Sequence, residues 1–138
     1  MIYMTQRITS NEFLDKIQQG QKEFSHIEID CADMSGKNFS GLHIKNSKFV
    51  FVALRNCNFN DVVFENCEIN LVTMGYSTFN DTSFIKCNFD YAGFSWCNFQ
   101  NTKITKSTLH VITMLEANTG GLDIIDCVEF DIFRNIFQ

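Results

Sequence analysis

Large apolar residues recur at every fifth position through most of this 138-residue chain. From Phe24 to Thr119, nineteen of the twenty positions in this register are large and apolar, and Thr119 is the exception. From residue 32 onward, the position two residues earlier is mainly small or β-branched, although Lys37 is an outlier and Leu42 and Ile112 are large for it. The other three positions of each five are mostly polar or glycine. A five-residue repeat therefore organises residues 24–119.

A period of five matches neither an α-helix, with about 3.6 residues per turn, nor a strand, whose side chains alternate every two residues. It predicts a chain that turns after every five residues and directs one large and one small side chain inward. Four such sides make a coil of about 20 residues, so we expect about five coils. Ten of the 15 phenylalanines lie at the large position. Eight of them define the expected core ladder: Phe49, Phe59, Phe64, Phe79, Phe84, Phe89, Phe94 and Phe99.

Several of these units resemble the motif of the pentapeptide-repeat family, which is roughly Ala-Asp/Asn-Leu-X-X. Residues 32–36 read Ala-Asp-Met-Ser-Gly, and residues 57–59, 87–89 and 97–99 are Cys-Asn-Phe versions of the same motif. The resemblance implies an all-β fold, a right-handed quadrilateral parallel β-helix that rises about 4.8 Å per coil. It says little about activity, because a fold does not determine a function.

The first 23 residues are expected to form a cap over the start of the coils. Thr9 and Glu12 have the spacing of a helix capping box, and Phe13, Leu14 and Ile17 would form one apolar face. Gly20 follows as a helix stop. The pattern therefore predicts a short helix near residues 10–19 that packs on the first coil.

The C-terminal segment, residues 120–138, allows two interpretations. Gly120-Gly121 would mark a break after the last repeat at residue 119. Helical spacing is present in Ile132, Phe133, Ile136 and Phe137, whereas Val128, Phe130 and Ile132 alternate like a strand. In either case the segment is too apolar for a free tail, so we expect a C-terminal cap or a dimer contact.

Outward positions 20 residues apart should stack on the same side of the rod, and two of these rows are apolar. The first row, at one corner, contains Phe51, Leu71, Tyr91 and Val111, and the second, at the next corner, contains Tyr76 and Trp96. Between them lie small residues: Ala53, Thr73, Gly75, Gly93, Ser95 and Thr113. Scattered surface apolar residues that stack along a ladder would explain the pattern. A contiguous apolar patch more often marks a contact, so these six large residues are the candidate interaction face.

No constellation of residues in the sequence points to catalysis, a cofactor or a metal ion. His26, His43 and His110 have no Cys, Asp or Glu at ligand spacing, and no C-x-x-C pair occurs. Four of the six cysteines, Cys57, Cys67, Cys87 and Cys97, fall at the small inward position, where a thiol acts as a compact apolar filler. We therefore expect no enzyme activity, no cofactor and no metal.

Charge and hydropathy narrow the expected partners. A net charge of −5 argues against direct nucleic-acid binding, because phosphate contacts need clustered lysine and arginine. No signal peptide is visible, and no apolar stretch approaches the roughly 18 residues of a membrane span. A cytoplasmic protein with reduced thiols is the expectation, without a membrane partner.

These features together predict a non-catalytic scaffold that binds another protein or associates with itself as a homodimer. The family resemblance implies an alternative, because some pentapeptide-repeat proteins imitate DNA and bind DNA gyrase, which protects it from quinolones. That function would need a long acidic stripe, and acidic side chains are sparse on this short rod: Asp61, Glu65, Glu68, Asp81 and Asp90.

Overall fold

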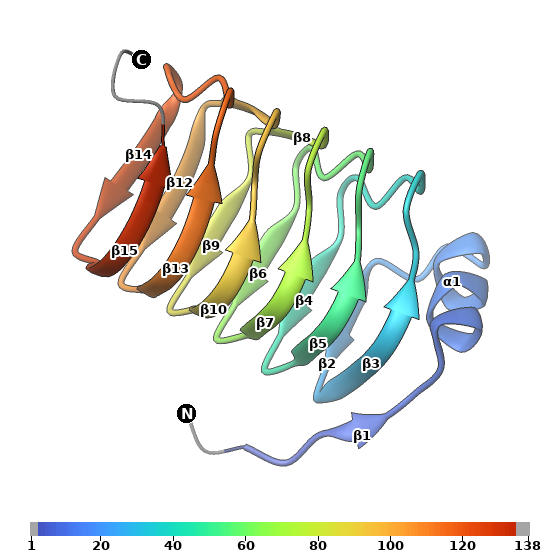
Figure 1. Ribbon diagram of the computed structural model, residues 1–138. Coiled ribbons are helices and arrows are strands. Elements are labelled where there is room, and N and C mark those ends of the chain that lie inside the picture. The colour runs from blue at the N-terminus through green and yellow to red at the C-terminus, as the bar shows by residue number, and fades with distance from the viewer. Residues whose placement is uncertain (1–2, 135–138) are drawn as a thin grey trace.

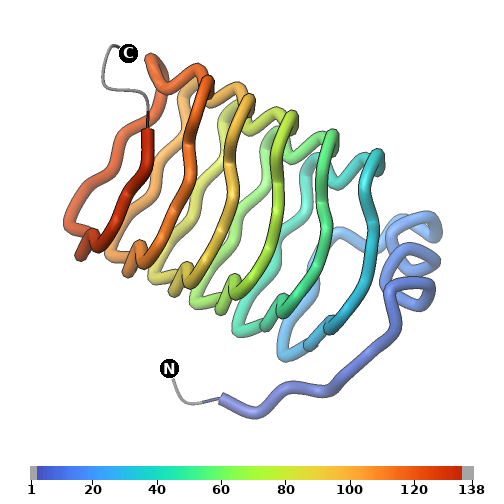
Figure 2. The backbone as a smooth tube through the Cα atoms, viewed as in Figure 1, coloured from blue at the N-terminus to red at the C-terminus, as the bar shows by residue number. Residues whose placement is uncertain are grey.

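The computed structural model describes residues 3–134, which form a rod of stacked coils with one helix at its N-terminal end (Figure 1). The backbone trace winds around the rod axis about six times, one coil more than expected (Figure 2). The predicted all-β parallel β-helix with a short N-terminal helix is confirmed.

Three parallel sheets line the sides of the rod. The first has seven strands, in spatial order β1 (Gln6–Arg7), β3 (Ile27–Asp33), β5 (Lys48–Ala53), β7 (Glu68–Thr73), β10 (Asn88–Gly93), β13 (Thr108–Met114) and β15 (Val128–Arg134). The second runs β14 (Leu122–Ile125), β12 (Thr102–Thr105), β9 (Ser83–Ile85), β6 (Val63–Glu65), β4 (His43–Lys45) and β2 (Glu23–Ser25). The third pairs β11 (Asn98–Gln100) with β8 (Thr78–Asn80).

The strand register is 20 residues throughout the coils. Phe49 is paired with Ile69, which is paired with Phe89, which is paired with Leu109. Each residue therefore lies above the residue 20 positions earlier and shares its orientation. This register converts the five-residue sequence pattern into continuous columns along the rod.

The chain turns at each corner through a residue in the left-handed backbone region. Almost every fifth residue from His26 to Asp131 has a φ between 49° and 62° or is glycine. Asn, Asp and Gly tolerate this region best, and they occupy many of the corners. One turn per five residues gives the coil its four sides.

The core is a column of stacked side chains at the large inward position. All eight residues of the core ladder are at most 3% exposed. Rings one coil apart stack in nearly parallel planes, with centroids 5.0 Å apart for Phe59–Phe79 and 4.8 Å apart for Phe64–Phe84. Side chains of adjacent sides meet edge to face, as in the pair Phe79–Phe94. Such offset and edge contacts are the arrangements that aromatic rings prefer.

The small inward position contributes hydrogen bonds as well as volume. Cys97 donates its thiol hydrogen to the Met74 carbonyl oxygen at 2.9 Å. The Thr82 hydroxyl donates to the carbonyl oxygen of Phe59 at 2.6 Å, again 23 residues earlier. These bonds satisfy polar groups that would otherwise be costly to bury. They explain why Cys, Ser and Thr can replace one another at this position. The interpretation of the cysteines as apolar fillers did not include this hydrogen-bonding role.

Helix α1 (Ser10–Gln18) covers the N-terminal end of the rod, as the sequence predicts. The Glu12 backbone N–H donates to the Thr9 hydroxyl oxygen at 3.0 Å, which caps the helix. Phe13 is buried, and its ring lies 4.7 Å from the ring of Phe24 and 6.1 Å from that of Phe39. The helix therefore closes the open core of the first coil.

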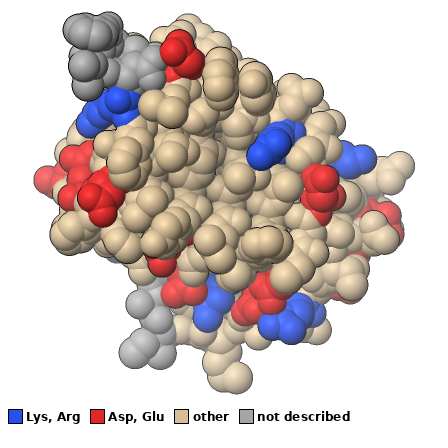
Figure 3. Space-filling view, viewed as in Figure 1, with Lys and Arg blue, Asp and Glu red and all other residues tan. Residues whose placement is uncertain are grey.

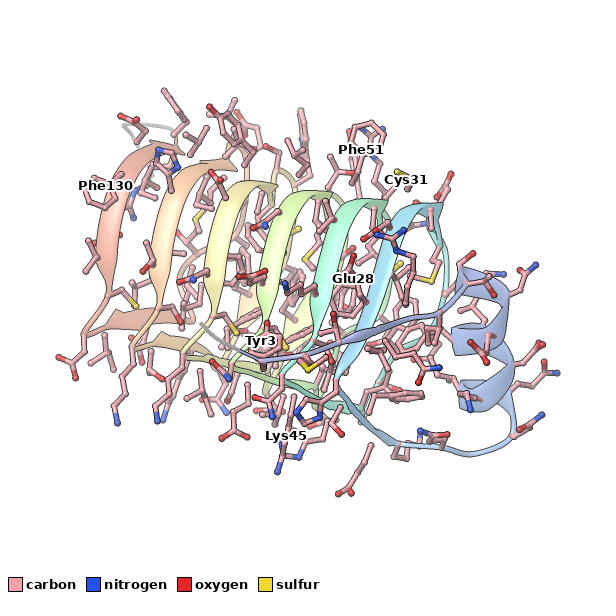
Figure 4. All side chains as sticks on the ribbon, turned by 90° about the horizontal axis from the view of Figure 1, so that it is seen from below. Tyr3, Glu28, Cys31, Lys45, Phe51 and Phe130 are labelled. Atoms are coloured by element: carbon pink, nitrogen blue, oxygen red, sulfur yellow. The ribbon has the colours of Figure 1, made fainter. Side chains whose placement is uncertain are left out.

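An N-terminal arm, residues 3–8, lies along the outside of the first coils before α1 begins (Figure 4). Arg7 forms ion pairs with Glu28 at 3.2 Å and with Asp30 at 2.7 Å. The hydroxyl of Tyr3 donates to the Ser47 carbonyl oxygen at 3.0 Å. Partial burial raises the pKa of Tyr3, and the nearby Glu68 carboxylate raises it further.

The structure corrects the expected end of the repeats at residue 119. Strands β14 and β15 continue the 20-residue register, and β15 replaces the helical alternative for Ile132 and Phe133. Gly120-Gly121 is part of a coil, because a Cβ at Gly121 would lie 2.9 Å from backbone atoms of Phe99, Gln100 and Asn101. Only glycine allows that approach. Ile136 and Phe137 lie outside the described residues.

Candidate interaction face

The six candidate residues lie on the surface in two rows. Phe51, Leu71 and Tyr91 are 64%, 50% and 54% exposed, and Val111 continues the row half-buried. Phe51 projects away from the ribbon in Figure 4. In the second row Tyr76 and Trp96 are 58% and 52% exposed. We call the surface between and including these rows the apolar-bordered face.

The Tyr76 and Trp96 rings form a preorganised pair. Their centroids lie 5.2 Å apart and their planes differ by 2°. Both belong to the same corner of successive coils, where the backbone positions are fixed by parallel pairing. A rigid aromatic pair of this kind offers a large contact area without loss of side-chain freedom on binding.

The floor between the rows is low and flat because its residues are small. A Cβ at Gly93 would come within 3.3 Å of the Thr113 hydroxyl oxygen, so even alanine would crowd the contact between these two coils.

The 20-residue register adds three residues to this face that the sequence analysis missed. Cys31 begins the first row and is exposed, Arg55 joins the floor, and Leu115 is 43% exposed above Ser95. Their column positions, counted in steps of 20, would have revealed them.

A shallow hollow lies at the N-terminal end of this face. Its volume is about 410 Å³, and the residues around it are Cys31, Ala32, Asp33, Phe51, Val52, Ala53, Leu71 and Thr73. Its walls are mainly apolar, and its floor is the outer surface of strands β3, β5 and β7. The hollow could receive an apolar side chain of a partner, but it is too open to exclude water from a reaction.

The two apolar rows occupy backbone positions that disfavour them. Phe51, Leu71, Tyr91, Val111 and Trp96 all have φ between 54° and 58°. Non-glycine residues lose roughly 1–2 kcal/mol in this region, and β-branched residues tolerate it least. The backbone therefore does not explain why bulky apolar residues occupy these two corners.

At the other two corners, the same turn contains residues suited to it. One corner has Gly41, Asp61, Asp81 and Asn101, and the other has Asn46 and Asn66 among its members. Lys86 and Lys106 show that lysine also adopts the turn, with φ of 55° and 52°. Bulky apolar residues at left-handed corners thus occur only along the two corners that border the apolar-bordered face.

On the neighbouring polar face, asparagine side chains hydrogen-bond to the backbone of the turns and of the next coil. The side-chain oxygen of Asn58 accepts from the Asn60 backbone N–H at 2.8 Å, and that of Asn60 accepts from the Asn80 N–H at 2.9 Å. These bonds stabilise the turns and the stacking of the coils. These asparagines therefore have a structural role, whereas the buried Oδ1 of Asn80 has no hydrogen-bond partner in the described structure.

Side chains that could bind a metal ion are not clustered in the described part of the chain. Within residues 3–134, no group of three or more His, Cys, Asp or Glu side chains could hold a metal ion. His43 and His110 each contact a single carboxylate, that of Glu65 at 3.3 Å and that of Asp90 at 2.8 Å. None of the helices described over this range is long and apolar enough to cross a membrane.

Three of the four buried thiols have a raised pKa. Burial raises the pKa of Cys57 and of Cys87, and it raises the pKa of Cys97 to about 12. The thiolate is the reactive form of cysteine, so these side chains remain protonated fillers near neutral pH.

Comparison with known proteins identifies the repeats. A family model described as pentapeptide repeats, with eight copies, matches residues 32–61 and 67–105, which together make up half of the chain. The chain belongs to the pentapeptide repeat family. No curated protein sequence matches it significantly.

Solved structures of other pentapeptide repeat proteins share this fold at low sequence identity. HetL, a pentapeptide repeat protein involved in heterocyst differentiation regulation from the cyanobacterium Nostoc sp. strain PCC 7120, superposes with a TM-score of 0.75 at 13% identity. The match covers 80% of this chain but only 46% of HetL. A trypsin-treated form of QnrB1, a plasmid-mediated fluoroquinolone resistance protein, gives a TM-score of 0.50 at 13% identity and 84% coverage of both chains. At this identity the likeness shows the fold alone.

Proposed function

We propose that this pentapeptide repeat protein is a non-catalytic scaffold that binds another protein through its apolar-bordered face. The observation that carries the proposal is the pair of exposed apolar rows at left-handed corners. These residues oppose both solvation and backbone preference, so an external contact is the simplest reason for their presence.

The shape of the face suits a protein partner rather than a small ligand. Aromatic anchors such as Tyr76, Tyr91 and Trp96 are the residues that most often dominate protein interfaces. The floor between the rows is flat and uncharged apart from Asp33 and Arg55 near its N-terminal end. A partner with a complementary apolar ridge or strand could lie along the rod between the two rows.

The DNA-mimic alternative remains a prediction, and the charge pattern gives it little support. On the first sheet, Lys48 lies between Glu28 and Glu68 in one column and forms an ion pair with Glu68 at 3.6 Å. Figure 3 likewise shows acidic and basic groups side by side on the visible surface. A surface that imitates the DNA backbone would need negative charges without such interruptions.

The proposal is tested by a pull-down with the tagged protein, followed by measurement of the affinity of the purified partner. The test variants are Tyr91→Lys and Trp96→Lys, and the matched control is Asn66→Lys at another corner. All three place lysine in a turn that Lys86 and Lys106 already adopt, so folding should be preserved. We expect roughly tenfold or greater loss of affinity with the test variants, and less than about twofold with the control.

Circular dichroism melts of all variants accompany the binding measurements. Partners that bind the test variants and the wild type equally well would contradict the proposal. If only Trp96→Lys unfolds, the Trp96 ring stabilises the fold. The variant Trp96→Ala, with a smaller uncharged side chain, would then be used in the binding measurement.

A further inference from the structure

The outer surface of the seven-stranded sheet differs between its two halves. In the N-terminal half the charged side chains pair with one another, Arg7 with Asp30 at 2.7 Å and Lys48 with Glu68 at 3.6 Å. The same two columns of outward residues continue into the C-terminal half as polar residues and then end in apolar ones. One column continues with Asn88, Thr108 and Val128, and the other with Asp90, His110 and Phe130.

Four polar side chains form a compact rectangle on this C-terminal half. Asn88 is paired with Thr108, and Asp90 with His110, across strands β10 and β13. Neighbouring strands lie about 4.8 Å apart, and residues two positions apart on one strand about 6.6 Å apart, so the four side chains start close together. All four line a hollow of about 520 Å³, to which Phe130 and the backbone neighbour Phe89 also contribute. This volume is within the roughly 300–1,000 Å³ of small-molecule sites.

Most polar groups of this hollow have unused hydrogen-bonding capacity. One hydrogen bond joins them, between His110 Nδ1 and Asp90 Oδ1 at 2.8 Å. The other carboxylate oxygen of Asp90, Nε2 of His110 and the side chains of Asn88 and Thr108 have no hydrogen-bond partner within residues 3–134. The asparagines of the neighbouring polar face, in contrast, bond to the backbone. The hollow therefore presents donors and acceptors together.

Phe130 forms the C-terminal wall of the hollow. Its side chain projects from β15 and is 52% exposed (Figure 4). Its ring lies 6.1 Å from the imidazole of His110, and the two planes differ by 84°. One coil earlier, the Tyr91 ring meets the same imidazole edge to face at 5.9 Å. These contacts hold the imidazole between two rings and leave an aromatic surface beside the polar groups.

This combination matches the chemistry of a neutral sugar ring. A sugar hydroxyl both donates and accepts hydrogen bonds, so it can use the Asn88 amide, the Thr108 hydroxyl and the Asp90 carboxylate alike. A guanidinium or ammonium group only donates, which would leave the amide N–H groups of Asn88 unmatched. An anion would be repelled by Asp90. The C–H groups of a sugar ring can also pack on Phe130, because the face of an aromatic ring is negative.

We propose that this hollow is a binding site for a neutral saccharide. Asn88, Asp90 and Thr108 hydrogen-bond to its hydroxyl groups, and Phe130 packs against its ring. His110 positions Asp90 through Nδ1 and presents Nε2 to the ligand. The hollow is open on its outer side, so it accommodates a single sugar or one unit of a longer chain. The site lies on a different side of the rod from the floor of the apolar-bordered face, and the proposal does not depend on a protein partner.

The test is saturation-transfer NMR with the methyl glycosides of glucose, galactose and mannose, followed by titration calorimetry. At least one of these neutral glycosides should receive saturation from the protein and bind with a Kd of about 1 mM, which corresponds to a few hydrogen bonds and one ring contact. Glucuronate has the same ring with a carboxylate added. It should bind at least about tenfold more weakly, because the carboxylate of Asp90 repels it.

Two variants locate the site on the rod. Asn88→Ala removes hydrogen bonds and Phe130→Leu removes the aromatic ring, and each should weaken binding by roughly tenfold. The matched control is Asn70→Ala, because Asn70 faces outward in the same sheet but does not line the hollow. It should change the Kd by less than about twofold. Trp96→Lys should also leave glycoside binding intact, which separates this site from the apolar-bordered face.

Circular dichroism melts establish that each variant is folded, and Thr108→Val, which keeps the side-chain shape, replaces any variant that is not. A lack of saturation transfer to all three glycosides at about 50 mM would overturn the proposal. Binding that persists unchanged in Asn88→Ala and Phe130→Leu would overturn it as well, because the sugar would then lie elsewhere. Equal binding of glucuronate and the neutral glycosides would contradict both the role of Asp90 and the neutral class of ligand.

Discussion

At the scale of single residues, the rod depends on side chains that are both small and able to hydrogen-bond. The inward thiols of Cys57 and Cys97 donate to carbonyl oxygens of the preceding coil, Cys57 to Met34 at 3.4 Å. Ser77 in the same position donates to Leu54 at 3.1 Å and also accepts from the Cys57 backbone N–H. A neutral thiol meets the same need as a hydroxyl, provided that it stays protonated.

The buried thiols should make the protein sensitive to alkali. In the unfolded chain Cys97 ionises near pH 8.5–9, but burial raises its pKa to about 12 in the fold. Its stabilising contribution is therefore complete only below about pH 8.5 and is lost as the pH rises toward 12. Chemical denaturation at pH 8, 9.5 and 11 in reducing buffer should show a falling free energy of unfolding. Cys97→Ala should reduce the slope by up to about 1.4 kcal/mol per pH unit.

Alanine is a suitable replacement because Ala92 and Ala117 occupy the same inward position elsewhere in the repeats. An identical slope in the variant and the wild type would mean that Cys97 does not remain protonated in the folded state.

At the scale of the structural element, the unit is one five-residue side that ends in a left-handed corner. Core packing restricts the residue types at the two inward positions, and the left-handed backbone restricts those at the corner. The two outward positions of each side are therefore free to vary. The rows at Phe51 and Tyr76 violate the corner preference, with φ of 57° and 62°. Elements that break a local rule in this way are where function is expected.

Replacing a strained apolar corner should not harm folding. We expect Leu71→Asn to leave the free energy of unfolding unchanged or to raise it by up to about 1 kcal/mol, because asparagine tolerates the left-handed region. Leu71→Ile keeps the apolar area but adds β-branching, so it should destabilise the protein. Urea denaturation of the three proteins provides the comparison. A loss of more than about 1 kcal/mol in the asparagine variant would show that the row is kept for packing along the rod.

At the scale of the whole molecule, stability is carried by contacts between successive coils. Phe79 in the middle of the rod is fully buried, and its ring lies 5.0 Å from Phe59 below and 5.2 Å from Phe99 above. The repeats therefore form one continuous core, in which each coil stabilises both neighbours.

A cavity in the central coil should weaken the entire rod. Phe79→Ala is expected to lower the free energy of unfolding by about 3–5 kcal/mol, because the rings above and below cannot collapse into the space. Phe79→Leu retains most of the volume and should cost less. Equilibrium denaturation followed by circular dichroism gives both values. An unchanged midpoint for the alanine variant would be incompatible with an inward-facing ring.

The sequence predicted the register well and the C-terminal end poorly. Every residue at the large inward position from Phe24 to Met114 is buried, because one period held without interruption. The end was misjudged at Thr119, where the large position first becomes polar and two glycines follow. In space, Gly121 is the residue that fits the tight contact with Phe99, and Ile124 resumes the column. A local pattern could not reveal a contact between coils.

The five-residue period of the sequence by itself determined which positions face inward, and the resemblance to pentapeptide repeats supplied the four-sided coil. It also determined which residues share a column, since residues 20 apart must stack once each coil has four sides. Only the tertiary structure showed the backbone conformation and the hydrogen bonds of the residues in those columns. It showed that apolar rows lie on strained corners and that thiols bond to the preceding coil. It also showed that β14 and β15 continue the 20-residue register, because such relations arise only when coils are stacked.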